Sequence, residues 1–469
     1  MKTQIKIFFV FAILLAICTS CKKSWLDAKP NKALVVPSTI QDYQALLDNN
    51  VAQPSAATAV FNTNQASLGE VATDEYYLTY SSWQSLSTKQ EKNAYIWNAD
   101  IYQGEQTGFD WKYAYNQILN TNIVLEGIDK ITPDANSQAA WNNVKGSALF
   151  FRAFNLYGLT QIYCKPYNST TAGTDLGLPL RLTSNINEKS VRSTLQQAYD
   201  QIFQDLKTAK TLLPQSPLGS FPTRPSINGV YALLARIYLS MNDFDKAFLY
   251  SDSCLQFRNQ LMDFNSLSAT ATFSINPFCV EDIFHSDLDR YSALNFVSVT
   301  IPDSTVYNSI VSNDLRKVMF YRFRSNVWRF WGSYSTALKI YGGLATDEMY
   351  LIRAECNARK GNTNAAMADL NTLLVTRWKA VSGVSTFIPY TATSADDALA
   401  QILTERRKEL QFRGTRWSDL RRLNQDPRFA ITLVRILNGQ TYTLPPNDKR
   451  YVFPIPPDEI SLSGIQQNP

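Results

Sequence analysis

The sequence has very little histidine. Its 469 residues include one, His285, so a catalytic arrangement that needs an imidazole base has only one possible centre. The sequence also lacks the HExxH motif of zinc proteases, the GxSxG motif of serine hydrolases and a glycine-rich phosphate-binding loop. We therefore predict that the protein is not an enzyme, that it has no catalytic residue and that it needs no cofactor.

Potential metal ligands are also scarce. Once the leader with Cys18 is removed and Cys21 is set aside, the four remaining cysteines form no CxxC motif, so neither a disulfide framework nor a cysteine-based metal site is predicted. The best alternative is a cluster of acidic residues around the single histidine, which lacks the glycine turn and regular oxygen spacing of an EF-hand loop. Its members are Glu281, Asp282, His285, Asp287 and Asp289. We interpret them as solvated loop charges and predict no metal site.

Only the N-terminus has a long apolar run. Lys2 and Lys6 precede eleven apolar residues from Ile7 to Ile17, a run that is too short to span a bilayer comfortably. Small residues and Cys21 follow, as at a bacterial lipoprotein cleavage site. We predict a signal peptide over residues 1–20, lipidation of Cys21 and a polar tether over residues 21–37. The alternative is simple secretion with a free Cys21.

The charge balance gives no sign of a polyanion partner. The formal net charge is +5, and it falls to about +3 without the two lysines of the leader. One segment, Glu405–Arg422, contains six arginines, a composition that also occurs in nucleic-acid-binding segments. Acidic residues interleave with these arginines, and Leu410, Phe412, Trp417 and Leu420 supply an apolar face. A structural helix rich in ion pairs is the better interpretation, and no nucleic-acid partner is predicted.

A helical hairpin occurs twice in the sequence. Tyr231–Leu255 has the same pattern as Tyr350–Leu374, with Asn242 and Gly361 where a residue of positive φ would end the first helix. Asp243 or Thr363 would then cap the second helix. Such pairs are typical of tetratricopeptide repeats, whose single units cannot bury their apolar faces alone. Their wide spacing predicts a mainly α, tetratricopeptide-like scaffold with long irregular insertions and little β structure.

Other segments also show helical periodicity. These predicted helices are Thr39–Asn49, Phe109–Ile131, Ala135–Cys164, Thr194–Leu213, Ala395–Phe412 and Thr415–Asn424. The insertions are Ala56–Gly108 and Arg258–Ala345, and within the second of these Tyr321–Phe330 alternates aromatic and basic residues as short strands do. The tail from Asp426 is predicted to be coil.

The two insertions are rich in side chains that suit sugars. A sugar ring has an apolar face and a hydroxyl rim, so a binding site combines exposed aromatic rings with polar groups. The candidate ligand-binding residues are Asp74, Tyr76, Tyr77, Trp83 and Trp97 in the first insertion and Tyr321, Arg324, Trp328, Arg329 and Trp331 in the second. For any one of these aromatic residues, packing in the core is the alternative.

The order of several motifs resembles the SusD/RagB family of Bacteroidetes outer-membrane lipoproteins. The matching segments are Cys21–Asp27, Gly146–Tyr163, Gly177–Leu180, Asp314–Arg316, Lys339–Tyr341, Met349–Glu355, Glu405–Arg422 and Tyr451–Ile460. The resemblance implies about four tetratricopeptide-like helix pairs in a single domain over residues 38–469. Its N-terminal half would span residues 38–225 and its C-terminal half residues 226–469.

The resemblance also implies a function. A family member would be a lipid-anchored outer-membrane protein that faces the cell exterior, captures a glycan and delivers it to a SusC-like TonB-dependent transporter. One alternative is capture of peptides or glycoconjugates, which predicts a deep cavity in place of an open aromatic surface. Another is a repeat scaffold for a protein partner, which predicts an exposed apolar groove. A glycoside hydrolase would require a facing pair of carboxylates in a cleft.

Overall fold

The computed structural model describes residues 36–50, 60–217, 221, 223–288, 291–336 and 339–469. The predicted leader, the lipidation site Cys21 and almost all of the tether lie outside these residues. The chain divides into Met1–Ser38 and a compact unit over Thr39–Pro469, and it is this unit that is described below. Among the described residues, no helix has both the length and the apolar character that crossing a bilayer requires.

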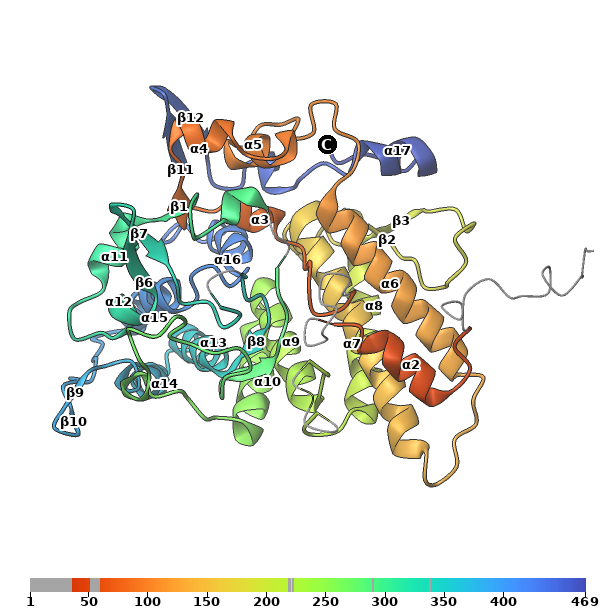
Figure 1. Ribbon diagram of the computed structural model, residues 1–469, viewed down its shortest axis with the longest axis horizontal. Coiled ribbons are helices and arrows are strands. Elements are labelled where there is room, and N and C mark those ends of the chain that lie inside the picture. Colours follow the sequence, from red (N-terminus) through yellow and green to blue (C-terminus); the bar gives the residue numbers. More distant parts are fainter. Residues whose placement is uncertain (1–35, 51–59, 218–220, 222, 289–290, 337–338) are drawn as a thin grey trace, which may run out of the picture. The chain divides into compact units, whose positions relative to one another are not determined.

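Three long helices form the N-terminal part of the unit. Helix α7 (Gln138–Tyr163) packs between α6 (Phe109–Ile128) and α8 (Leu195–Leu212) (Figure 1). Most of α7 is buried because it carries apolar and aromatic side chains on nearly all of its faces. Helix α2 (Ile40–Leu47) packs on α6 and α7 and begins with a capping box between Thr39 and Asp42. The predicted helices of this region are confirmed to within a few residues.

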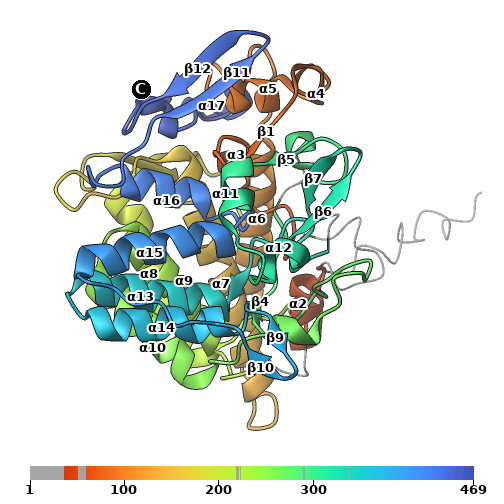
Figure 2. The ribbon, with the colours of Figure 1, turned by 90° about the vertical axis from the view of Figure 1, so that its left-hand side faces the viewer.

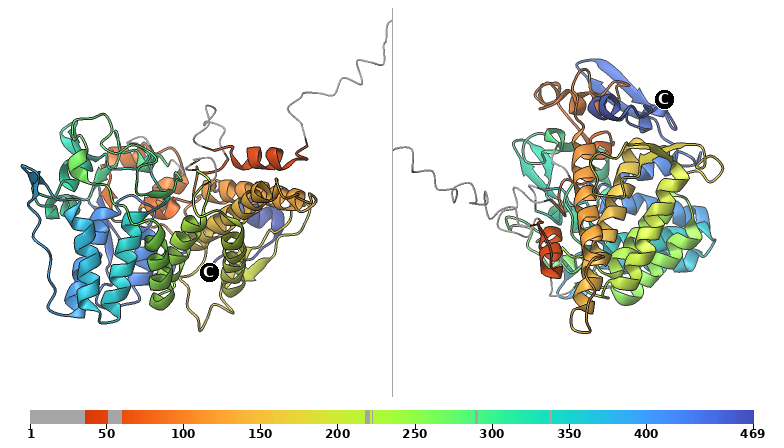
Figure 3. Two further views of the ribbon diagram at one scale, coloured as in Figure 1. Left: turned by 90° about the horizontal axis from the view of Figure 1, so that it is seen from below. Right: turned by 90° about the vertical axis from the view of Figure 1, so that its right-hand side faces the viewer.

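The two predicted repeat hairpins are confirmed. The first consists of α9 (Ile227–Ser240) and α10 (Phe244–Phe257), and the second of α13 (Thr346–Arg359) and α14 (Thr363–Val375). Helix α10 packs against α13, so that the green and cyan pairs lie side by side (Figure 3). Helices α15 (Ala395–Glu409) and α16 (Arg416–Leu423) follow, and α15 packs on α13 and α14.

The turns of the two hairpins have the expected geometry. Asn242 has a φ of 59° and Gly361 a φ of 81°, and the side chain of Asp243 accepts the first free amide of α10, that of Lys246. The prediction for the second hairpin is wrong in one detail. Thr363 is the first residue of α14, and Asn362 holds the capping position without a side-chain hydrogen bond.

The β structure consists of small two-stranded sheets. In the insertions, β1 (Tyr76–Tyr77) pairs with β5 (Ile301–Pro302), β6 (Tyr321–Arg324) pairs with β7 (Val327–Phe330), and β4 (Asp282–Phe284) pairs with β8 (Leu344–Ala345). The other pairs are β2 (Leu176–Pro179) with β3 (Arg192–Thr194), β9 (Ala380–Val381) with β10 (Val384–Ser385), and β11 (Leu433–Leu437) with β12 (Gln440–Leu444). Short helices complete the insertions: α3 (Leu68–Val71), α4 (Tyr80–Gln84), α5 (Lys89–Tyr95), α11 (Ser304–Ser309) and α12 (Arg316–Met319).

The coil predicted for the tail is wrong. Residues Leu433–Leu437 alternate between buried and exposed, and they turn back at Asn438-Gly439, where both residues have a positive φ. Asn-Gly is the preferred pair for a two-residue β-hairpin, so the sequence contained the signal for this turn. A last helix, α17 (Pro457–Ser463), begins with a proline in its first turn.

We predict that Gly361→Ala lowers the free energy of unfolding by about 1 kcal/mol, because an alanine at this φ is strained although no atom lies near its Cβ position. Gly173→Ala is the matched control, since its Cβ position is also open and its φ is not in the left-handed range. Urea denaturation of both variants measures the difference. Equal stabilities would contradict the role given to this turn.

Candidate functional site

The second insertion is joined to the helical scaffold by buried ion pairs. The guanidinium of Arg377, which follows α14, bonds Glu281 at 2.8 Å and Glu409 of α15 at 2.7 Å. Arg316 of α12 bonds Asp314, Glu405 and Glu409 at 2.6, 2.5 and 3.1 Å. These groups are buried almost completely. The insertion therefore has a fixed position relative to α14 and α15.

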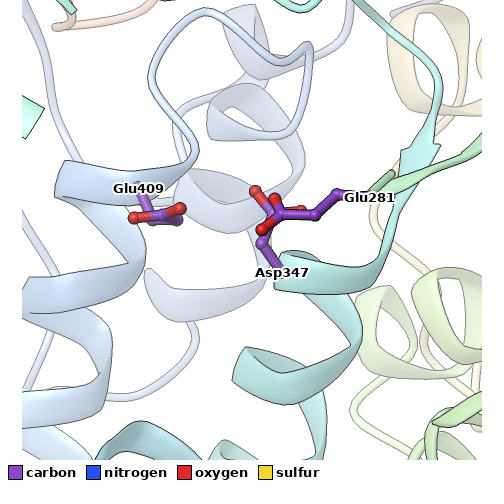
Figure 4. A group of neighbouring side chains, drawn as sticks. All are labelled: Glu281, Asp347 and Glu409. Carbon is purple, nitrogen blue, oxygen red and sulfur yellow. The ribbon is translucent and has the colours of Figure 1, made fainter. Parts of the chain in front are cut away.

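Three carboxylates of this network lie close together. Oxygens of Glu281, Asp347 and Glu409 lie within 4.8 Å of one another (Figure 4). Each carboxylate has an arginine partner, because Arg377 bonds Glu281 and Glu409 and Arg413 bonds Asp347 at 3.3 Å. The arginines thus supply the positive charge that a divalent cation would bring. We interpret the cluster as an ion-pair network.

The protonation of this cluster follows from burial and from its arginines. Burial raises the pKa of Glu281 and of Asp347, and the arginines offset this effect only in part. Burial acts on Glu409 as well, but Arg377 and Arg316 outweigh it and lower its pKa. All three carboxylates are closed off from solvent, with at most 1% of each residue exposed. They therefore do not form the open pair that glycoside hydrolysis needs.

The acidic cluster around His285 is not solvated, contrary to the prediction. Glu281, Asp282, His285 and Asp287 are all buried, and Asp289 lies outside the described residues. His285 bonds Asp282 at 2.5 Å and lies 3.5 Å from Asp287. Burial lowers the pKa of His285, but the two aspartates outweigh this effect and raise the pKa to about 9. The imidazole is therefore a buried cation at neutral pH.

Aromatic side chains reach the surface at the tip of the β6–β7 hairpin. Tyr321 lies opposite Phe330 and Phe323 lies opposite Trp328, all on one face of the hairpin. The first pair is buried, whereas Phe323 is 58% exposed and Trp328 is 38% exposed. The same face thus begins in the core and ends at the surface, so that buried rings support the exposed ones.

A third ring extends this exposed pair. Tyr307 of α11 stacks on Trp328, with 4.5 Å between the ring centroids and 30° between the planes. Lys317 places its ammonium group 4.9 Å from the centroid of Tyr307. We call Tyr307, Phe323 and Trp328, together with Lys317 at their edge, the aromatic surface. It offers flat apolar rings beside a cationic donor.

The first insertion meets the second where β1 pairs with β5, a strand that packs on β7. Tyr77 of β1 lies opposite Ile301 of β5, and Arg329 of β7 donates to the carbonyl of Thr300 at 2.8 Å. Burial lowers the pKa of Arg329, and Tyr77 is near enough to raise it slightly in return. Tyr77 is 47% exposed. Tyr77 of the first candidate set and Arg329 of the second therefore lie close together, although Arg329 itself is buried.

Trp83 lies in a separate aromatic pair. It stacks on Tyr80 in α4, with 5.8 Å between the ring centroids, and its indole nitrogen donates to the carbonyl of Lys92 at 2.9 Å. Trp83 is partly buried and Tyr80 is exposed. In the second insertion, Arg324 is exposed over the ring of Trp331, and the indole nitrogen of Trp331 donates to Thr272. Trp83, Arg324 and Trp331 remain candidate ligand contacts.

Several predicted contacts do not fit the structure. Tyr76, Trp97 and Tyr321 are buried in the core, where a ligand at the surface does not reach them. Arg329 is buried as well, so its role is to position β7. Asp74 bonds Arg416 at 2.7 Å and Arg407 at 3.0 Å, and these arginines hold its pKa well below the usual range despite its burial. Its carboxylate is therefore engaged in ion pairs within the protein.

The arginine-rich segment is confirmed as structural. Arg406, Arg416 and Arg422 are buried or nearly so, and each pairs with a carboxylate, at distances of 2.6 to 2.7 Å. Arg407 of α15 joins the two insertions, because it bonds Asp74 of the first and Asp303 of the second at 3.0 and 2.9 Å.

Sequence reasoning missed two rings of the aromatic surface. Phe323 lies opposite Trp328 because Ser325 and Asn326, both at positive φ, form a two-residue turn, and that register could have been deduced from the strand pattern. Tyr307 is 21 positions before Trp328 in an irregular segment, and no local pattern signals their contact.

Known families match both halves of the chain. A family described as "Starch-binding associating with outer membrane" matches residues 24–239, and one described as the SusD family matches residues 289–469. A search of curated proteins found no match.

Solved structures match nearly the whole chain. A protein from Bacteroides vulgatus shares 22% identity and has a TM-score of 0.70, with 93% of this chain and 99% of that chain covered. A SusD superfamily protein from Bacteroides thetaiotaomicron shares 21% identity, with a TM-score of 0.69 and 92% and 100% coverage. A SusD-like carbohydrate binding protein from B. vulgatus also shares 21% identity, with a TM-score of 0.63 and 91% and 97% coverage. At these identities the likeness establishes the fold.

We predict that Arg377→Met lowers the free energy of unfolding by roughly 3–5 kcal/mol, because it leaves the buried carboxylate of Glu281 without a counterion and removes one of the two arginines that bond Glu409. The control Arg428→Met removes a half-exposed arginine that also pairs with two carboxylates, and its cost is below about 1 kcal/mol. Urea denaturation at neutral pH measures both. Similar costs for the two variants would contradict the structural role of the network.

We predict that the imidazole of His285 titrates near pH 9 in the folded protein. Since the chain has one histidine, ¹³C-histidine labelling gives a single imidazole signal to follow by NMR. The folded pKa lies above the unfolded value of about 6.5, so the stabilisation is complete below pH 6.5 and is lost as pH rises through 9. The loss is roughly 3 kcal/mol. A folded-state titration near pH 6.5, as in the urea-denatured control, would contradict it.

Proposed function

The chain belongs to the SusD/RagB family, and we propose that it is a non-catalytic, glycan-binding lipoprotein of the outer membrane. In this proposal, a lipid on Cys21 anchors the protein at the outside of the cell. The protein captures an oligosaccharide or polysaccharide and delivers it to a SusC-like TonB-dependent transporter. The family descriptions, starch-binding and outer-membrane association, support the ligand class and the location.

The aromatic surface is the observation that carries this proposal. Phe323 and Trp328 present exposed rings on one side of a hairpin, and Tyr307 stacks on Trp328 at 4.5 Å. Sugar rings place their C–H faces on such rings, while their hydroxyls need donors and acceptors at the edge. Lys317 at the edge supplies such a donor.

The support for this surface matters as much as its exposed rings. Trp328 lies on the same face of the hairpin as Tyr321 and Phe330, whose side chains are buried in the core. Arg407 of α15 forms ion pairs with both insertions. A surface held in this way loses little conformational freedom when a ligand binds, which raises affinity for a weakly held ligand such as a sugar. The site is open, which suits an internal stretch of a long glycan.

The absence of a catalytic role rests on the chemistry of the carboxylates. Near the aromatic surface, Asp303 and Asp74 are held in ion pairs by Arg407. The acidic cluster of Glu281, Asp347 and Glu409 is buried and bonded to arginines. We therefore propose that a bound glycan leaves the protein intact.

The test is binding of the chain from Lys22 onward to a panel of plant, host and microbial polysaccharides, by affinity electrophoresis followed by calorimetry. We expect Trp328→Ala to weaken binding to the retained glycan by at least about tenfold, because aromatic contacts dominate such sites. Tyr307→Ala is expected to act in the same direction. Phe257→Ala is the matched control, since this exposed ring of α10 stacks on Tyr231, away from the aromatic surface.

The outcomes separate the alternatives. Retention of a glycan by the wild type, its loss in Trp328→Ala and the absence of newly released reducing ends support the proposal. Release of reducing ends would show a hydrolase. Retention of peptides in place of any glycan would favour peptide capture. An equal loss of glycan affinity in Phe257→Ala would show that the aromatic surface is not the binding site.

A further inference from the structure

A cavity lies on a part of the fold that the aromatic surface does not use. It has a volume of about 400 Å³, within the usual range for small-molecule sites. Its walls come from the end of α7, the loop before β2, the end of α16 and the C-terminal segment, and Figure 2 shows this blue segment beside α16. The residues on which its chemistry depends are Lys165, Asp175, Arg421, Asn424, Asp448 and Lys449.

Arg421 is the unusual member of this wall. Its side chain is buried, with 3% exposed, and its two terminal nitrogens donate to the backbone carbonyls of Gln161 and Cys164. Its Nε makes no hydrogen bond, and no described carboxylate forms an ion pair with it. Burial lowers the pKa of Arg421, but an arginine stays charged in a protein.

The neighbouring arginines make this exception clear. Each of the neighbouring arginines bonds a carboxylate: Arg416 and Arg422 on the same helix α16, and Arg406 on α15. A buried cation without a counterion is costly, so the cost at Arg421 needs an explanation that its neighbours do not. An anionic group in the cavity would supply the missing counterion.

The rest of the wall offers groups for the remainder of such a ligand. Asn424 and Tyr451 are buried there, and their side chains lie within reach of each other. Lys449 adds an exposed cation at the rim. Asp175 and Asp448 are neutralised by Lys165 and Arg450, at 2.7 and 2.8 Å, and their oxygens can accept hydroxyl protons.

From this combination we propose that the cavity binds one acidic sugar, a ring that carries a carboxylate. The carboxylate lies toward Arg421 and Asn424, and the hydroxyls lie toward Asp175 and Asp448. Leu176, Tyr451 and Val452 form an apolar wall against which the ring packs. This site is distinct from the aromatic surface because the two share no residue.

The experiment is calorimetry of the chain from Lys22 onward with glucuronate and galacturonate. Glucose and galactose test the need for the carboxylate, and acetate and phosphate test whether a bare anion suffices. We expect the two uronates to bind and the four other compounds to bind at least about tenfold more weakly.

Variants locate the binding. Lys449→Glu reverses an exposed charge at the rim, and Val452→Trp fills the cavity, so each is expected to weaken uronate binding by at least about tenfold. Lys379→Glu is the control, because it makes the same charge change on an exposed lysine outside the cavity. Arg421→Lys keeps the charge but removes Nε, and circular dichroism reports whether this variant is folded.

Each outcome decides the proposal. Equal binding of acetate or phosphate would show a site for a bare anion, and equal binding of glucose or galactose would show that the carboxylate is not recognised. Absence of uronate binding would overturn the site, as would uronate binding that survives both Lys449→Glu and Val452→Trp. Trp328→Ala is expected to leave uronate binding unchanged, so the failure of this site and the failure of the glycan-binding aromatic surface are distinguishable.

Discussion

Arg377 lies between two buried carboxylates, and the bonds to them join three distant parts of the chain. Glu281 belongs to the second insertion, Arg377 follows the last repeat helix, and Glu409 ends α15. Buried ion pairs add little net stability compared with apolar packing, but they are specific, because a displaced partner leaves a charge unpaired. The second insertion has only short strand pairs and isolated backbone bridges to fix it. The network supplies that constraint. Arg316 and Arg413 form further buried ion pairs next to it, with Asp314, Glu405 and Asp347.

The aromatic surface depends on the same constraint. Its rings lie on a hairpin of two four-residue strands and on a six-residue helix, elements too short to be stable alone. Tyr321 and Phe330 anchor the hairpin in the core, and Arg407 holds the two insertions against α15. The scaffold of repeats is therefore the rigid part, and the insertions carry the chemistry, as loops on rigid scaffolds commonly do.

The scaffold could be predicted from the sequence because its signals are local. Helical periodicity, the turn residues Asn242 and Gly361 and the capping Asp243 each act within a few positions, and the structure confirms them. The alternation around Trp328 likewise predicted β6 and β7. The burial of His285 could not be predicted, because its partners Asp282 and Asp287 look like solvated charges until the core closes over them. Neither could the stacking of Tyr307 on Trp328, which depends on where an irregular segment folds back.

The most direct measurement is a crystal structure of the chain from Lys22 onward with a retained oligosaccharide bound. The account predicts sugar rings packed against Trp328 and Tyr307, with hydroxyls toward Lys317, and no change in the positions of the buried ion pairs. A glycan bound elsewhere on the molecule, with Phe323 and Trp328 free of contact, would contradict it.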